Sequence, residues 1–466
     1  MSPRTRLMAS PAPGHGIGRT VRWLLHQEAR ALLTRLAGVK PFALQETMLP
    51  AAAITPAALV GIESVLLTER TKLLNRVHGF IRWLDGPGST APPDQLQRRF
   101  TLVRLNFNTV LSQFDLFSDV ITQRSEQQTG VWLSGLDVFC ADALSLQGAY
   151  FDAPNVICYL DRGPGAAIRR ARTRLPGGAE NPVAIVRVPR ERMVGHGIAS
   201  SVTHEVGHQA AALLDLVASL RPVIQARQRA APPSESAAWG FWDRWISEIV
   251  ADLWSVGKLG ISSTLGLVGV VSLPSYFVFA LHPEDPHPMP YLRVRLSCAI
   301  GRALYPHRQW RELARMWSAL YPPTGLDESR RRVIEAMEST MPEFVALLVD
   351  HRPRSLRGRS LREIMPLAER RPERLIALDR EWGQRLDRMR DQPPTLVFAV
   401  LGQARTRGSV SPESESELVG KLLTYWALRS TLELAGASAP SRVLPPALTP
   451  VPNGRPHRAA PMPVSV

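Results

Sequence analysis

The sequence predicts a mainly α-helical (α+β) fold, in which a small β-sheet lies among long helices. Apolar residues recur at three- and four-residue spacing over much of the 466 residues, and this is the period of an amphipathic helix. Two short runs rich in branched residues, 155–160 and 183–188, have the composition of strands. With 45 % hydrophobic and 21 % charged residues, the chain can bury a core, so a wholly disordered or low-complexity protein is excluded.

Changes in composition divide the chain into five expected segments. They are a disordered amino terminus (1–19), a helical amino-terminal region (20–130), a core that carries the motifs described below (131–300), a helical carboxyl-terminal region (301–435) and a disordered Pro/Ala-rich tail (436–466). The tail has no periodic apolar pattern, and such a segment cannot bury enough apolar surface to fold.

The helical amino-terminal region is expected to begin with an amphipathic helix. Arginines would occupy its solvent face, and apolar residues at three- and four-residue spacing its buried face. The residues expected on the buried face are Trp23, Leu24, Leu32, Leu33 and Leu36.

The formal net charge is +15, and arginine carries almost all of the positive charge. The arginines are spread along the chain instead of forming one block, so no specific nucleic-acid partner is predicted. We interpret the charge as surface composition that suits an acidic substrate or partner. The lysines are Lys40, Lys72, Lys258 and Lys421.

The cysteine content and the amino terminus both favour a cytoplasmic protein. The three cysteines are widely spaced and include no C-x-x-C, so neither a disulfide framework nor a cysteine metal site is predicted. Cys158 and Cys298 are expected to be packed thiols, not nucleophiles. The first residues lack the apolar run and small-residue cleavage site of a secretory signal.

The most informative motif is H-E-x-x-H, formed by His204, Glu205 and His208 inside a predicted helix at 198–225. Histidines four positions apart lie on one face of a helix, one turn from each other, so both imidazoles can bind one tetrahedral Zn²⁺. Glu205 would then be the general base that takes a proton from water and returns it to the leaving amine. A helix that carries two satisfied structural histidines is the alternative.

A zinc site of this kind needs a third protein ligand. The metzincin continuation is absent, because Ala211 and Leu214 stand where that class has Gly and His. Glu248, on a second predicted helix at 237–256, is the better candidate. Asp252 lies one turn further along and could accept the free ring N–H of a zinc histidine, which would fix the orientation of that ring. Two acids on an exposed helix are the alternative interpretation.

A third element follows at 285–293. Prolines at positions 286, 288 and 290 favour a stiff, extended backbone, which could present His287 and Arg293 at fixed positions. Either side chain could bind the oxyanion of a tetrahedral intermediate or a substrate carbonyl.

Together the three elements resemble the gluzincin metallopeptidases of the HtpX and CAAX prenyl protease group, which share the order H-E-x-x-H, E-x-x-x-D and His-Pro with a later Arg. The matching residues are His204, Glu205, His208, Glu248, Asp252, His287, Pro288 and Arg293. The resemblance covers about residues 183–295 and implies a zincin-like core. It implies zinc held by His204, His208 and Glu248. It also implies catalysis by Glu205, support from Asp252 and hydrolysis of peptide bonds in a protein or peptide substrate.

Residues 259–281 contain no charged residue and are long enough to cross a bilayer. Glu248 and His287 flank this run, however, and both are expected at one zinc ion. A crossing would separate the two ends of the run by about 30 Å. We therefore expect a buried, interrupted helical hairpin behind the site and a soluble relative of the group, with a membrane-anchored protease as the alternative.

Two further expectations concern the surroundings of the zinc helix. The strand at 183–188 could be an edge that aligns a substrate peptide by adding a strand to the sheet, or an ordinary core strand. His196 is expected to be a loop or capping residue. The function predicted overall is a zinc-dependent metalloendopeptidase. The alternative is a zincin-fold protein in which catalysis is dispensable and which acts as a binding or assembly component.

Overall fold

The computed structural model describes residues 16–40, 42–163, 165–190, 195–282 and 284–438. Helices dominate these residues and a three-stranded sheet accompanies them, which confirms the predicted mainly α-helical fold. The predicted disordered segments at the two ends lie mostly outside the described residues, although α1 already begins at Ile17 and α17 ends at Ser438. The helices are α1 (Ile17–Gly38), α2 (Pro56–Asp85), α3 (Pro93–Thr122), α4 (Gln127–Leu144), α5 (His196–Leu213), α6 (Leu216–Ala230), α7 (Pro233–Leu259), α8 (Ile261–Val271), α9 (Ser275–Val278), α10 (Pro290–Leu304), α11 (Gln309–Leu320), α12 (Glu328–Asp350), α13 (Leu361–Ile364), α14 (Pro372–Trp382), α15 (Leu386–Met389), α16 (Pro394–Thr406) and α17 (Pro412–Ser438).

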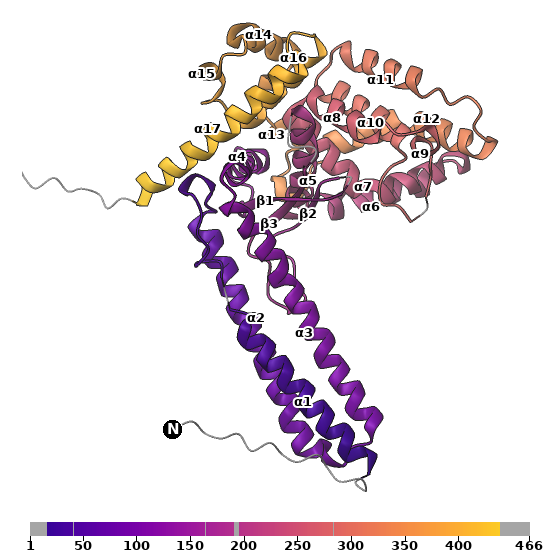
Figure 1. Cartoon of the computed structure of the whole chain (residues 1–466). Coiled ribbons are helices and arrows are strands. Elements are labelled where there is room, and N and C mark those ends of the chain that lie inside the picture. The colour runs from indigo at the N-terminus through magenta and orange to yellow at the C-terminus, as the bar shows by residue number, and fades with distance from the viewer. Residues whose placement is uncertain (1–15, 41, 164, 191–194, 283, 439–466) are drawn as a thin grey trace, which may run out of the picture.

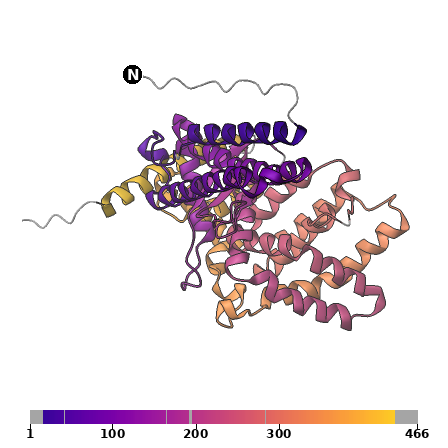
Figure 2. The ribbon, with the colours of Figure 1, turned by 90° about the horizontal axis from the view of Figure 1, so that it is seen from below.

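Helices α1, α2 and α3 lie side by side and project from the rest of the molecule as an arm (Figures 1 and 2). The expected buried face of α1 is partly wrong, since Trp23 and Leu24 are 54 % and 49 % exposed. The residues of α1 that are buried are spaced four, three and four positions apart, and this spacing places Trp23 and Leu24 on other faces of the helix. The buried residues of α1 are Leu25, Ala29, Leu32 and Leu36.

The sheet has the order β1-β3-β2. Its strands are β1 (Val156–Asp161), β2 (Ala167–Arg169) and β3 (Ala184–Pro189). The two predicted strands are therefore confirmed to within one residue, and the short β2 was not predicted. Because β1 pairs with β3 in parallel and β2 pairs with it antiparallel, β3 is the central strand. On its second edge β2 covers residues 185–187, so a substrate cannot pair with that part of the strand, and its burial there is that of a core strand.

The sheet separates two hydrophobic cores. Side chains alternate between the faces of a strand, so Ile157 and Ile185 belong to the core of the arm. Cys158 and Val186, on the other face of the sheet, belong to the second and larger core. This core lies between the sheet and the body, which we define as residues 127–438 without the sheet. That larger core also contains buried residues of α16 and α17, so the carboxyl-terminal helices enclose the same interior as α5 and α7.

The predicted helix at 198–225 is two helices, α5 and α6. The backbone of Asp215 adopts a left-handed conformation (φ 50°), which ends the first helix and lets the second begin in a new direction. At the other end α5 starts at His196, earlier than expected. There the Glu415 carboxylate from α17 accepts the His196 backbone N–H at 2.8 Å and so caps the helix.

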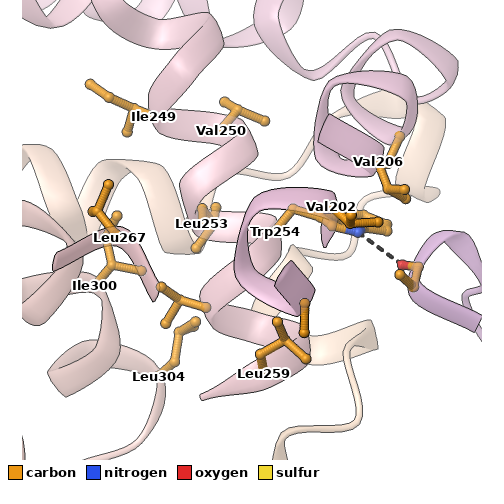
Figure 3. Close-up of a cluster of buried hydrophobic side chains, with 14 of the residues drawn as sticks. Val202, Val206, Ile249, Val250, Leu253, Trp254, Leu259, Leu267, Ile300 and Leu304 are labelled. Atoms are coloured by element: carbon orange, nitrogen blue, oxygen red, sulfur yellow. Dashed lines mark hydrogen bonds between the residues drawn. The ribbon is translucent and has the colours of Figure 1, made fainter. Parts of the chain in front are cut away.

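Helix α7 is buried on nearly all sides, and its tryptophans fill the body core. It lies very close to α5, because a Cβ atom on Gly207 would come within 2.9 Å of the Ala251 Cα atom. Figure 3 shows Val202 and Val206 of α5 beside Trp254 of α7, whose indole N–H donates to the Ala143 carbonyl at 3.0 Å. The buried tryptophans of α7 are Trp239, Trp242, Trp245 and Trp254.

The uncharged run at 259–281 forms the end of α7, the largely buried α8 and the short α9. Residues 272–274 interrupt it, as the position of Pro274 led us to expect, but the expected burial is wrong for residues 272–277, which are exposed. Within the described part of the chain, none of the helices has both the length and the apolar character that a membrane crossing requires.

Candidate metal centre

The centre is built where α5 and α7 meet. His204 and His208 project from consecutive turns of α5, with their ring centroids 4.8 Å apart and the ring planes at 86°. The Glu248 carboxylate of α7 lies between them, with Oε2 3.2 Å from His204 Nε2 and Oε1 3.3 Å from His208 Nε2. One ligand atom from each of the three residues lies within 4.8 Å of the other two, a spacing that could hold a metal ion.

The close contact between the two helices explains why these three side chains converge. Gly207 directly precedes His208, and its missing side chain lets the backbone of α5 approach Ala251. Ala251 in turn lies one turn after Glu248 on α7. A larger residue at either contact would move the carboxylate away from the two imidazoles.

Asp252 contacts the second ring nitrogen of His204, and Arg293 in turn contacts Asp252. The Asp252 Oδ1 atom lies 2.8 Å from His204 Nδ1, so Nδ1 faces this carboxylate and Nε2 faces Glu248. The Arg293 guanidinium, from α10, donates to both Asp252 oxygens, at 2.7 and 2.9 Å. The contact of Asp252 with a histidine, predicted from the sequence, is present. Arg293, which was expected to face the substrate, contacts Asp252 instead.

Burial and mutual attraction set the charges of this group. Burial alone would lower the pKa of His204, but the carboxylates of Asp252 and Glu248 raise it to about 9. Burial opposes ionisation of Asp252 as well, yet Arg293 and His204 lower its pKa to about 2. The two histidines likewise lower the pKa of Glu248 against the effect of its burial. Both carboxylates are therefore ionised at neutral pH, and a bound cation would displace the extra proton that His204 carries.

Glu205 follows His204 on α5 and is partly exposed, so solvent reaches it. Its carboxylate is not one of those ligands. Burial lowers the pKa of Arg293, but Asp252, Glu248 and Glu205 together raise it above its usual value. Glu205 thus acts electrostatically on the same group of residues that surrounds the two histidines.

His287 reaches the centre from the segment between α9 and α10. Its Nε2 atom lies 3.4 Å from Glu248 Oε2, and its side chain is 51 % exposed, in contrast to the 14 % of His204. On its other side, Nδ1 lies 2.7 Å from the Asp285 carboxylate. Sequence analysis did not assign a role to Asp285. The sequence did contain a signal for this contact, because an Asp side chain often accepts the backbone N–H of the residue two positions later.

Ser247 was also missed. Its hydroxyl oxygen lies 3.5 Å from His208 Nδ1, which is at the long limit of a hydrogen bond. The position of Ser247 in the sequence does not distinguish it from other serines of the chain. Its contact with His208 depends on how α7 is rotated relative to α5.

The remaining candidates lie away from the centre. His196 was expected to be a loop or capping residue, but it is the first residue of α5 and is itself capped by Glu415, whose carboxylate also lies 2.9 Å from His196 Nδ1. Cys158 and Cys298 are buried. A hydrogen bond to Cys140 and burial raise the pKa of Cys158 well above the usual range, and burial raises that of Cys298 to about 12. Neither thiol is therefore an effective nucleophile at neutral pH.

Comparison with known proteins gives no further indication of function. The chain matches no family model, no curated protein and no solved structure.

Proposed function

We propose that the protein is a zinc-dependent metallopeptidase that hydrolyses peptide bonds in a protein or peptide substrate. The observation that carries this proposal is the convergence of His204, His208 and Glu248, with Glu205 next to His204 on α5. Two imidazole nitrogens and one carboxylate oxygen form a donor set typical of catalytic zinc sites, which leave one position open. The order of the motifs, which resembles that of gluzincins, supports the same choice of metal and reaction.

The ion would polarise the scissile carbonyl and lower the pKa of a water molecule. Each residue then has a distinct role. Glu205 accepts a proton from the attacking water and returns it to the leaving amine. His287, the more exposed histidine, contacts the substrate beside the Glu248 carboxylate. Arg293 neutralises the buried Asp252 carboxylate, which in turn orients the His204 ring.

The second candidate is a binding or assembly component that retains the metal centre for stability. The arm favours this candidate, because it projects from the body and exposes large apolar side chains. The exposed apolar residues near the start of α1 include Ile17, Trp23 and Leu24. An intact Glu205 favours the peptidase, since a purely structural metal site has no use for a general base.

The variant Glu205→Gln distinguishes the two candidates, because it keeps the shape of the side chain and removes the base. We expect wild type and variant to bind one equivalent of zinc each. Cleavage of casein and the appearance of new amino termini in a cell extract should fall by about 100- to 10,000-fold in the variant. A wild type without stoichiometric zinc, or a variant as active as the wild type, would contradict the peptidase proposal.

A further inference from the structure

We propose that Asp285 is a positioning residue for the reaction, and that it acts through His287. It holds the His287 ring so that Nδ1 faces Asp285 and Nε2 faces the space beside the Glu248 carboxylate. This inference rests on the proposed peptidase function and adds a residue to it that neither the motifs nor the metal ligands include.

The contacts between Asp285 and His287 restrict the orientation of the His287 ring. One oxygen of Asp285, Oδ1, accepts the His287 backbone N–H at 2.9 Å and lies 2.7 Å from Nδ1 of the same residue. A carboxylate that is bonded to both the backbone and the ring of one residue restricts rotation about the side-chain bonds of that residue. The ring plane of His287 is therefore fixed relative to its own backbone.

The surrounding backbone is also restricted. Prolines at 286, 288 and 290 fix φ on both sides of His287, and Pro288 and Met289 are buried. The Met289 carbonyl accepts the Arg293 backbone N–H at 2.9 Å in the first turn of α10. The segment that carries His287 is thus anchored to the helix that supplies Arg293, so a fixed ring is also fixed relative to the metal centre.

The same arrangement occurs twice at this centre. His204 has Nδ1 2.8 Å from the Asp252 carboxylate and Nε2 3.2 Å from Glu248, and His287 has Nδ1 2.7 Å from Asp285 and Nε2 3.4 Å from Glu248. The difference is exposure. His204 is largely buried and belongs to the three potential ligands, whereas His287 is half exposed and does not. A ring oriented in the manner of a ligand but open to solvent is suited to contact a substrate.

The pairing also decides which ring nitrogen carries a proton. A carboxylate can only accept hydrogen bonds, and two carboxylates face this ring. Asp285 is the closer one, 2.7 Å from Nδ1, whereas Glu248 lies 3.4 Å from Nε2, so Asp285 receives the hydrogen bond of the single ring N–H. In neutral His287 the proton is therefore on Nδ1, and Nε2 is the nitrogen left for the substrate. Free histidine has no such constraint, and loss of Asp285 would allow the ring to rotate and the proton to move to Nε2.

Kinetics on the zinc-loaded protein test this inference. We expect Asp285→Ala to lower kcat for casein cleavage by about 10-fold or more, with zinc stoichiometry unchanged. Asp285→Asn, whose amide oxygen can still accept the Nδ1 proton, should recover part of the loss. Glu284→Gln is the matched control, since it removes a negative charge from the neighbouring exposed position, and its activity should equal that of the wild type.

A double variant separates positioning from general stability. If Asp285 acts only through His287, then His287→Ala and the double variant His287→Ala/Asp285→Ala should have the same kcat/KM. A further loss in the double variant would overturn the inference, and so would full activity of Asp285→Ala.

A second measurement does not depend on hydrolysis. In protein labelled with ¹⁵N-histidine, neutral His287 should carry its proton on Nδ1 in the wild type and shift toward Nε2 in Asp285→Ala. The signal is assigned from its disappearance in His287→Ala. A wild-type ring protonated on Nε2 would overturn the inference about Asp285. An inactive wild type with the expected shift would contradict only the proposed function.

Discussion

The arm and the body differ in where their charged pairs lie: both have pairs at the surface, and the body also buries a pair beside the candidate metal centre. On the arm, pairs such as Arg98 and Asp94 lie at the surface, with side chains 78 % and 70 % exposed, although Glu69 is a buried exception. In the body, Asp252 and Arg293 are about nine-tenths buried and bonded to each other. Surface pairs contribute little to stability, whereas a buried charge depends on its partner. The buried pair of the body is therefore the place where a single charge change should have a large effect.

The largest effect is expected from Arg293→Leu, which would leave the buried Asp252 carboxylate without its cation. We predict that the free energy of unfolding falls by about 3–5 kcal/mol. Zinc affinity should fall by about 10- to 100-fold, because Asp252 would no longer be held against His204. Urea denaturation and a zinc titration measure the two effects.

The matched control on the arm is Arg98→Leu, which breaks a pair of similar chemistry at the surface. Its free energy of unfolding should change by no more than about 0.5 kcal/mol. Equal effects of the two substitutions would remove the contrast between the two regions.

Lys258 is a second buried cation of the body, and the dependence of stability on pH tests the effect of its burial. Burial lowers the pKa of Lys258 to about 8, against 10.5 for an unperturbed lysine, so unfolding takes up a proton between these two values. The cost of burying the charged form is present in full below pH 8 and disappears as the pH rises to about 10.5. From pH 8 to 10.5 the wild type should therefore gain up to about 3 kcal/mol of stability relative to Lys258→Met. Denaturation of both proteins across this range measures the gain, and parallel curves would contradict it.

The smallest predicted effect compares one glycine from each region. In the body, Gly207→Ala would place a Cβ atom 2.9 Å from the Ala251 Cα atom, and we expect a loss of about 1–3 kcal/mol together with weaker zinc binding. In the arm, a Cβ atom on Gly79 would meet nothing closer than 3.9 Å, so Gly79→Ala should stabilise α2 by about 0.5–1 kcal/mol. Thermal unfolding of both variants gives the signs, and a neutral Gly207→Ala would show that α5 and α7 can separate freely.

The candidate site was only partly predictable from the sequence. The spacing of His204 and His208 places them on one face of any helix, and the spacing of Glu248 and Asp252 does the same on the next helix. The role of Arg293 could not be derived in this way, because its bonds to Asp252 depend on how α10 packs against α7. Asp285 lies close to His287 in sequence, but its contact with the ring depends on a backbone turn that the spacing alone does not establish.

Local periodicity and composition determined the helical character of the chain, the two main strands and the pair of histidines, because each of these depends on residues a few positions apart. The tertiary structure decided that β3 is central, that Asp215 divides α5 from α6, and that Trp23 faces solvent. It also placed Glu415 at the start of α5, a contact between residues 219 positions apart. Contacts of this kind depend on how whole elements pack together, and no local pattern of side chains specifies that packing.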